Sequence, residues 1–257
     1  MNQFKNALAQ SKSQIGLFLS LASSYTAEVC AASDYDWLLI DAEHAPNDLR
    51  SVLHQLQTVA SYDVACVVRS PDSDINTIKM LLDIGVTNLM IPMISTVDQA
   101  RKVVEAVRYP PHGRRGIGHV LGRASRWGRD HDYYDRWAED ACIIVQIETS
   151  EGLANLDDIL GVEGIDGIFI GPSDFAASLG HPGDIAHPEV QSAIDRIIES
   201  AVSQGRIVGT ITTDEEKALD YFRKGCAMVA VGADVLLLAN AADRLARVMR
   251  EGLAERG

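Results

Sequence analysis

Eight short apolar runs recur along this 257-residue chain, and they constrain its fold more than any other feature. None alternates polar and apolar residues, as a strand with one solvated face would. The runs are IGLFLS (15–20), DWLLID (36–41), VACVVR (64–69), TNLMIP (87–92), CIIVQIE (142–148), GIFIGP (167–172), RIVGTI (206–211) and CAMVAVG (226–232). Continuous apolar runs of this length are typical of parallel strands that are buried on both faces.

Amphipathic patterns with apolar residues three and four positions apart fill the gaps between the runs. Several open with Ser, Thr, Asp or Asn and some end at Gly, as helices commonly do. Eight strand–helix units in about 250 residues predict an α/β fold of the (β/α)8 type, the TIM barrel. An open doubly wound sheet is the alternative, but it normally uses fewer strands and a glycine-rich phosphate turn, which the sequence lacks.

The chain has no linker rich in Pro or Ser, so we expect one domain over residues 1–257. That domain has an N-terminal helix, an Arg-rich insertion at about 108–141 and a C-terminal helix from about 233. The insertion is unusual for an acidic protein, because the stretch from Arg108 to Arg129 holds six arginines and no Asp or Glu.

Composition excludes several classes of function. The net charge of −13 argues against a nucleic-acid partner, because phosphate contacts need a basic face. No apolar run is long enough to span a membrane, and the polar start has no apolar signal core. The four scattered cysteines lack metal-ligand spacing and predict buried thiols of a cytoplasmic protein: Cys30, Cys66, Cys142 and Cys226.

Polar residues follow four of the apolar runs at the point where each run ends. They are Asp41 with Glu43 and His44 beyond it, Arg69, Gln146 with Glu148, and Ser173 with Asp174. Because the active site of a (β/α)8 barrel lies at the carboxyl ends of its strands, these side chains are expected at one rim. The alternative is that each caps its own helix, which suits Asp174 better than Glu148.

Glu148 and Asp174 lie one strand–helix unit apart, so their carboxylates are expected to be adjacent. Two like charges held close need a shared proton or a cation, and two carboxylates with open positions suit Mg²⁺ or Mn²⁺. Arg69 and Gln146 could then bind a small anion together with the backbone amides at Ser173 and Asp174. None of the six lysines follows a strand, which excludes a Schiff base at this rim and leaves carbanion chemistry to the metal.

Long motifs across the chain resemble one known family. WLLIDAEHAPND, VVR, LMIPM, RYPPHGRRGIG, RASRW, QIET and GVEGIDGIFIGPSDFAASLG are similar to the class II, metal-dependent pyruvate aldolases of the HpcH/HpaI family. The likeness runs roughly from residue 4 to residue 250. It implies reversible cleavage of 4-hydroxy-2-oxo acids, such as 4-hydroxy-2-oxoheptane-1,7-dioate, into pyruvate and an aldehyde such as succinic semialdehyde.

The resemblance also implies a cofactor, partners and a setting. The cofactor is a divalent ion, Mg²⁺, Mn²⁺ or Co²⁺, which holds the pyruvate enolate. The enzyme is expected to be a cytoplasmic homo-oligomer, with a hexamer suspected, and to serve aromatic catabolism. Its partners are small substrates, with neither nucleic acid nor membrane among them.

Roles transfer to this chain residue by residue. The resemblance makes Glu148 and Asp174 the metal ligands, and Arg69 the group that holds the keto oxygen and steadies the enolate. It assigns pyruvate binding to Gln146 with the amides near Ser173. These positions all match the motif, so the resemblance leaves the core chemistry intact.

Proton transfer is assigned to His44, which the family pairs with Asp83. Asp83 ends the helix before the fourth strand, so it is expected at the opposite end of the barrel from His44. Either Asp83 only caps its helix, or it reaches the His44 of a neighbouring subunit, which we favour. Asp41 and Glu43 are expected to orient metal-bound waters, unless they cap the helix that follows.

The arginine-rich stretch is expected to favour aldehydes that carry a carboxylate, with Arg123 and Arg126 as the contacts. The alternative is a solvated or subunit-facing loop. Two other functions compete with the aldolase. A citrate-lyase-like enzyme needs a further segment for CoA, which is not evident, and a non-catalytic protein that binds 2-oxo acids does not need His44.

Overall fold

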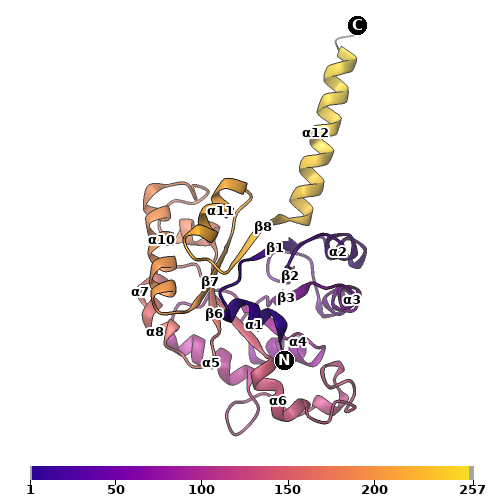
Figure 1. Cartoon of the computed structure of the whole chain (residues 1–257), viewed down its shortest axis with the longest axis vertical. Helices are drawn as coiled ribbons and strands as arrows, with labels where there is room; N and C mark the ends of the chain where they lie inside the picture. Colours follow the sequence, from indigo (N-terminus) through magenta and orange to yellow (C-terminus); the bar gives the residue numbers. More distant parts are fainter. Residues whose placement is uncertain (1, 255–257) are drawn as a thin grey trace.

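The computed structural model describes residues 2–254, in which eight parallel strands close into a barrel in sequence order (Figure 1). The strands are β1 (Gln14–Leu19), β2 (Trp37–Asp41), β3 (Ala65–Arg69), β4 (Asn88–Ile91), β5 (Cys142–Ile147), β6 (Gly167–Ile170), β7 (Ile207–Ile211) and β8 (Met228–Ala233). Parallel pairing of β8 with β1 closes the ring. The predicted (β/α)8 barrel is therefore confirmed, with a strand at each of the eight apolar runs.

Helices follow the strands and cover the outside of the barrel (Figure 1). They are α2 (Ser24–Ala31), α3 (Leu49–Val59), α4 (Ile75–Asp83), α5 (Val97–Val107), α7 (Ser150–Ala154), α8 (Leu156–Leu160), α9 (Pro172–Ser178), α10 (Pro188–Ser203) and α11 (Glu215–Arg223). Side-chain caps start several of them: Asp48 and Ser51 form a capping box at α3, and Thr96 and Gln99 form one at α5. Their apolar faces pack on the strands in one continuous core.

A second core fills the inside of the barrel. Phe18, Trp37 and Phe169 meet there, with ring centroids between 6.1 and 6.5 Å apart. Gly16 leaves room for the indole of Trp37, because any Cβ on Gly16 would collide with it. The helix α1 (Gln3–Ala9) adds Phe4 to this core and so covers the end of the barrel where the strands begin. The opposite end, where the strands finish, is left for polar residues.

Two segments depart from a plain barrel. The segment between α5 and β5 holds two short 3₁₀ turns, η1 (His119–Leu121) and η2 (Arg123–Ser125), and the helix α6 (Tyr133–Asp140). The last helix, α12 (Asp234–Ala254), projects away from the barrel instead of lying against it (Figure 1). Only Asp234 of α12 is buried, and the leucines of the helix face solvent.

The four cysteines form no disulfide with one another; two are buried and two are half-buried. No helix within residues 2–254 combines the length and apolar character that crossing a membrane requires.

Candidate active site

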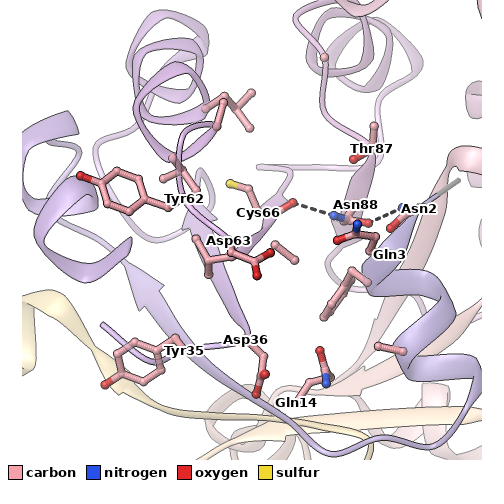
Figure 2. A pocket seen from close by; sticks show the side chains of 18 of the residues that line it. Asn2, Gln3, Gln14, Tyr35, Asp36, Tyr62, Asp63, Cys66, Thr87 and Asn88 are labelled. Carbon is pink, nitrogen blue, oxygen red and sulfur yellow. Dashed lines mark hydrogen bonds between the residues drawn. The ribbon is translucent and has the colours of Figure 1, made fainter. Parts of the chain in front are cut away.

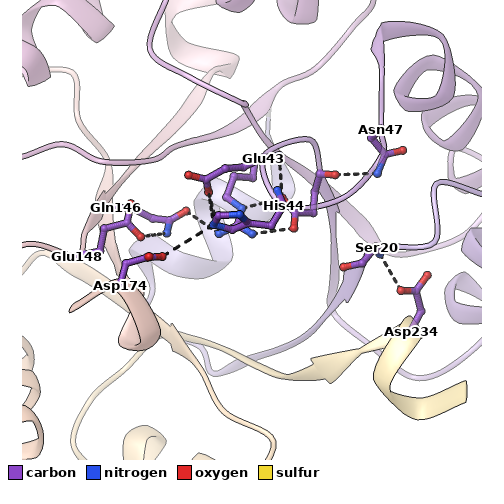
Figure 3. Close-up of polar contacts among 10 residues, drawn as sticks. Ser20, Glu43, His44, Asn47, Gln146, Glu148, Asp174 and Asp234 are labelled. Carbon is purple, nitrogen blue, oxygen red and sulfur yellow. Dashed lines mark hydrogen bonds and ion pairs between the residues drawn. The ribbon is translucent and has the colours of Figure 1, made fainter. Parts of the chain in front are cut away.

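Polar side chains gather where the strands end, among them Glu43, Gln146 and Glu148 (Figure 3), and Arg69 contacts several of them. Its Nε and Nη2 donate to the two carboxylate oxygens of Asp41 at 2.9 and 2.7 Å. Its Nη1 lies 3.1 Å from Glu43 Oε2 and donates to Gln146 Oε1 at 3.4 Å. The guanidinium is buried. Its two hydrogen bonds to Asp41 of the neighbouring strand hold it in one orientation.

Burial disfavours the charged forms of both Asp41 and Arg69, but their mutual attraction outweighs this cost. Burial would raise the pKa of Asp41, yet the hydrogen bonds and charge of Arg69 lower it overall. Burial would likewise lower the pKa of Arg69, yet Asp41, Glu43 and Glu148 raise it. Asp41 and Arg69 are thus a fixed ion pair at working pH.

The turn after β2 is organised by Asp41 and not by a helix cap. Asp41 Oδ1 also accepts from the backbone amides of Glu43 and His44, at 3.0 and 3.3 Å. Asp48 caps α3, so the alternative in which Asp41 or Glu43 caps this helix is wrong. Asp41 was also expected to orient metal-bound water. Both of its carboxylate oxygens bind Arg69 instead.

Glu148 is a buried carboxylate with two neutral donors. Gln146 Nε2 donates to its Oε2 at 2.7 Å, and the amide of Met93 donates to its Oε1 at 2.6 Å. Met93 has a φ of +58°, a conformation that residues other than glycine rarely adopt. Gly171 lies against the same carboxylate, and a Cβ there would collide with Glu148 Oε2. The ends of β4, β5 and β6 are therefore shaped around this one side chain.

Burial raises the pKa of Glu148 to about 7. The negative charges of Glu43 and Asp174 add to the rise, while the Met93 amide and Arg69 oppose it. Burial also raises the pKa of Glu43, whose Oε2 has no hydrogen bond among the described residues despite its ion pair with Arg69. Burial is therefore the main cause of both raised pKa values, and the neighbouring carboxylates add to it.

His44 stands between two carboxylates at the open side of the site (Figure 3). Its Nε2 lies 3.7 Å from Glu43 Oε2 and 3.9 Å from Asp174 Oδ2. The imidazole is 60% exposed and Asp174 is 53% exposed, so both can be reached from solvent. Asp174 lies in the first turn of α9, but the N-cap of that helix is Gly171, so the capping alternative for Asp174 is wrong. Ser173 shares this turn, whose first amides have no acceptor within the helix.

The residues present fit a hard divalent cation. Glu148 and Asp174 come from neighbouring units, interact electrostatically and offer oxygen ligands, and Glu43 adds a third carboxylate nearby. A cation of charge two would offset the buried negative charge of Glu148 and Glu43, whose ionised forms burial disfavours. Oxygen-only ligands favour Mg²⁺ or Mn²⁺ over softer ions.

Asp83 does not meet His44 within the chain. Its carboxylate, at the end of α4, binds Nη2 of Arg115 at 2.7 Å. Arg115 is fully buried, with its guanidinium carbon 4.6 Å from the ring of Tyr109 and 4.5 Å from that of Trp137. Sequence reasoning missed Arg115, since nothing in the arginine-rich stretch distinguishes it from its neighbours. A pairing of Asp83 with the His44 of another subunit stays a prediction.

Arg123 and Arg126 lie away from this site. Both line a cavity together with Gly85, shortly before the start of β4. Arg123 donates from Nη1 to the carbonyl of Ile84 at 2.9 Å and lines a cavity of about 820 Å³. That cavity is formed by residues at strand starts, including Gln14 and Asn88 (Figure 2). The expectation that Arg123 and Arg126 contact the aldehyde is therefore wrong for the site of their own chain, because strand starts and strand ends are opposite faces of a barrel.

The fold and the site together define a (β/α)8-barrel enzyme with a carboxylate-rich centre at the carboxyl ends of its strands. The chain belongs to the HpcH/HpaI aldolase/citrate lyase family, whose sequence pattern matches residues 14–241. It is thus an aldolase, a carbon–carbon lyase, of that family.

Individual relatives agree with this assignment. A hydroxypyruvate/pyruvate aldolase of Cupriavidus necator is 53% identical over 250 residues, which cover 97% of this chain and 93% of that protein. A 4-hydroxy-2-oxo-heptane-1,7-dioate aldolase of Escherichia coli is 49% identical over 245 residues, covering 95% and 94%. The crystal structure of a family member from Burkholderia cenocepacia superposes with a TM-score of 0.93 at 37% identity, covering 97% and 100%.

Proposed function

We propose that the protein is a class II pyruvate aldolase that reversibly cleaves 4-hydroxy-2-oxo acids into pyruvate and an aldehyde. The observation that carries this proposal is the position of Arg69, a buried cation that Asp41 holds beside the carboxylate of Glu148. Cleavage of the bond between C3 and C4 leaves negative charge on the keto oxygen of pyruvate. A fixed guanidinium at that oxygen lowers the barrier in the way an oxyanion hole does.

A divalent cation held by Glu148 and Asp174 would supply a Lewis acid for the same oxygen. Gln146 keeps Glu148 in place and, with the amides at Ser173, offers donors to the pyruvate carboxylate. His44 is the group that takes the proton from the C4 hydroxyl in cleavage and returns it in synthesis. The carboxylates of Glu43 and Asp174 both lie near its Nε2, at 3.7 and 3.9 Å.

The names of the relatives offer two candidates for the nucleophilic substrate, pyruvate and hydroxypyruvate. Pyruvate and hydroxypyruvate differ by one hydroxyl group, and the site's donors address the 2-oxo carboxylate that the two acids share. For the acceptor we propose succinic semialdehyde first, which makes 4-hydroxy-2-oxoheptane-1,7-dioate the substrate in the cleavage direction.

We further propose that the active protein is a homo-oligomer, and that a hexamer is its form. Support comes from α12, whose Leu237, Leu238, Leu245 and Met249 are each more than half exposed. A contiguous apolar helix face of this kind normally packs on protein.

One assay tests the reaction. The protein is mixed with Mg²⁺ or Mn²⁺ and 4-hydroxy-2-oxoheptane-1,7-dioate, and pyruvate release is followed. A parallel assay offers hydroxypyruvate with an aldehyde and follows loss of the aldehyde. Turnover only of a CoA thioester would favour a citrate-lyase-like enzyme, and binding of pyruvate without turnover would favour a non-catalytic binding protein.

A further inference from the structure

Two stacked histidines lie in the loop between α9 and α10, outside the site described above. The ring centroids of His181 and His187 are 3.5 Å apart and the ring planes differ by 16°. Nε2 of His181 lies 2.9 Å from Oε2 of Glu189, and Nδ1 of His187 accepts from the Glu189 amide at 3.3 Å. One ligand-type atom from each of these three residues lies within 4.8 Å of the other two.

The loop that carries the histidines is a defined turn. The amide of Asp184 donates to the His181 carbonyl at 3.1 Å, and the amide of His187 donates to the Asp184 carbonyl at 3.2 Å. Gly180 and Gly183 have φ values of +88° and +81°, which side-chain-bearing residues rarely adopt. The backbone therefore brings the two imidazoles together by construction, ahead of any ligand.

We propose that His181, His187 and Glu189 form a second cation site, selective for transition ions of the Zn²⁺ type. Two imidazole nitrogens and one carboxylate oxygen suit Zn²⁺, whereas Mg²⁺ prefers oxygen ligands throughout. When the ion binds, it displaces the hydrogen bond between His181 Nε2 and Glu189 Oε2, and His187 gives up the Glu189 amide, so that one neutral nitrogen of each ring turns toward the ion. Three protein ligands leave the remaining position to water.

A plain structural role leaves the second imidazole unexplained. The ion pair of His181 with Glu189 needs no ring stacked on it, and a cap for α10 needs only a short acceptor side chain. Two positively charged imidazolium rings would repel each other at this separation. A cation bound at the edges of the two rings instead uses both of them in their neutral form.

The consequence is local stiffening. The loop begins directly after α9, and the proposed site ties its first residues to the first turn of α10. The proposal does not depend on the reaction that the barrel catalyses, because its ligands are separate from Glu148 and Asp174.

Calorimetric titration of Zn²⁺ into protein saturated with Mg²⁺ tests the site. We expect Zn²⁺ to bind at a site that excess Mg²⁺ does not block, and to raise the melting temperature. His181→Phe keeps a flat ring on His187, His187→Asn keeps a capping acceptor, and Glu189→Gln keeps the side-chain length. Each variant should lose this binding event, whereas removal of an exposed imidazole elsewhere, in His54→Asn, should retain it.

Zn²⁺ can also enter the carboxylate centre, so the titration is repeated on the Glu148→Gln variant. Binding that survives this change and is lost on adding His181→Phe assigns the ion to the loop. Zn²⁺ binding that is lost in Glu148→Gln but retained in the three loop variants would overturn the proposal. So would a wild-type protein in which excess Mg²⁺ blocks all Zn²⁺ binding. If one loop variant fails to fold, the other two decide.

Discussion

Asp41 and Arg69 lie directly opposite each other at the ends of the neighbouring strands β2 and β3, and join through two hydrogen bonds of 2.9 and 2.7 Å. Because of this strand register, Nε and Nη2 of Arg69 bind Asp41 and fix the guanidinium in place. Nη1 points toward Gln146 and Glu43. This arrangement needs the planar guanidinium of arginine. One edge of the group binds Asp41, and the other edge is then free to bind the substrate.

Arg69→Lys should therefore behave as a severe change although it keeps the charge. A lysine ammonium cannot make the paired contacts to Asp41, so the donor at the keto oxygen is misplaced. We expect kcat to fall by about 10²–10³-fold, as for loss of one oxyanion donor. Exchange of the pyruvate methyl protons, followed by NMR, should fall in parallel. The matched control is Arg101→Lys at an exposed position of α5, and wild-type exchange in Arg69→Lys would remove Arg69 from the mechanism.

The carboxylate pair should act as a unit. Glu148→Gln and Asp174→Asn each keep size and shape but remove a negative oxygen ligand, so each should abolish most turnover while circular dichroism stays unchanged. Glu151→Gln, an exposed glutamate of α7, is the control and should retain activity. Full activity in a rigorously chelated sample would contradict metal dependence.

Cation binding should release protons in a defined pH window. The pKa of Glu148 is raised from 4.5 to about 7 in the metal-free protein, so below this value a proton occupies the ligand that the cation needs. The affinity for Mn²⁺ should therefore fall as the pH falls through about 7. Calorimetry in two buffers of different ionisation enthalpy would measure the released proton, and Glu148→Gln should abolish the buffer difference.

The same shift sets the sign for stability without metal. A carboxyl group whose pKa is higher in the folded state binds more protons there than in the unfolded state. Its contribution is present at low pH and is lost as the pH rises from 4.5 through about 7. Across this pH window, the melting temperature of the metal-free wild-type protein should therefore fall relative to that of the Glu148→Gln variant. An equal change in the two proteins would argue against the raised pKa.

Assembly should depend on α12. Leu237 and Leu245 are 52% and 62% exposed, and a charge on this face would prevent its burial against another chain. We expect the double change to Asp at these positions to give smaller particles in sedimentation velocity. Leu219→Asp, at a 52% exposed leucine of α11, should leave particle size unchanged. An unchanged assembly in the α12 variant would assign the oligomer to another surface.

Burial patterns carried most of what could be predicted from the sequence. The eight strands follow from continuous apolar runs, because only strands buried on both faces need them, and residues at the ends of those runs must meet at one rim. That reasoning placed Arg69 and Glu148 together before their contacts were known. It works because strand direction and side-chain alternation are properties of neighbouring residues.

Partner choice at a distance was not predictable in this way. Asp83 binds Arg115 across a long irregular segment, and nothing local distinguishes this arginine from Arg114 beside it. The amphipathic pattern of α12 likewise predicts a helix with an apolar face, yet a pattern does not state which molecule covers that face. Arg123 was expected near the substrate on charge alone, and its actual place depends on how the insertion folds under the strand starts.

The last prediction concerns a site shared between subunits. His44 and the carboxylate of Asp83 are 60% and 30% exposed, and within one chain they do not meet. Arg115 holds Oδ1 of Asp83, which leaves Oδ2 for an imidazole from another copy. A bond of that kind would orient His44 for proton transfer, so His44→Ala and Asp83→Ala should each be nearly inactive.

Mixing the two inactive variants, after dissociation and reassembly, should then restore part of the activity. One interface in a mixed oligomer joins the wild-type His44 of one chain to the wild-type Asp83 of the other. The control mixes His44→Ala with Glu148→Gln, whose lost groups belong to the same chain's site, so no complete site can form and no activity should return. If the first mixture regains no more activity than the second, Asp83 serves only to anchor Arg115 and the insertion to the end of α4.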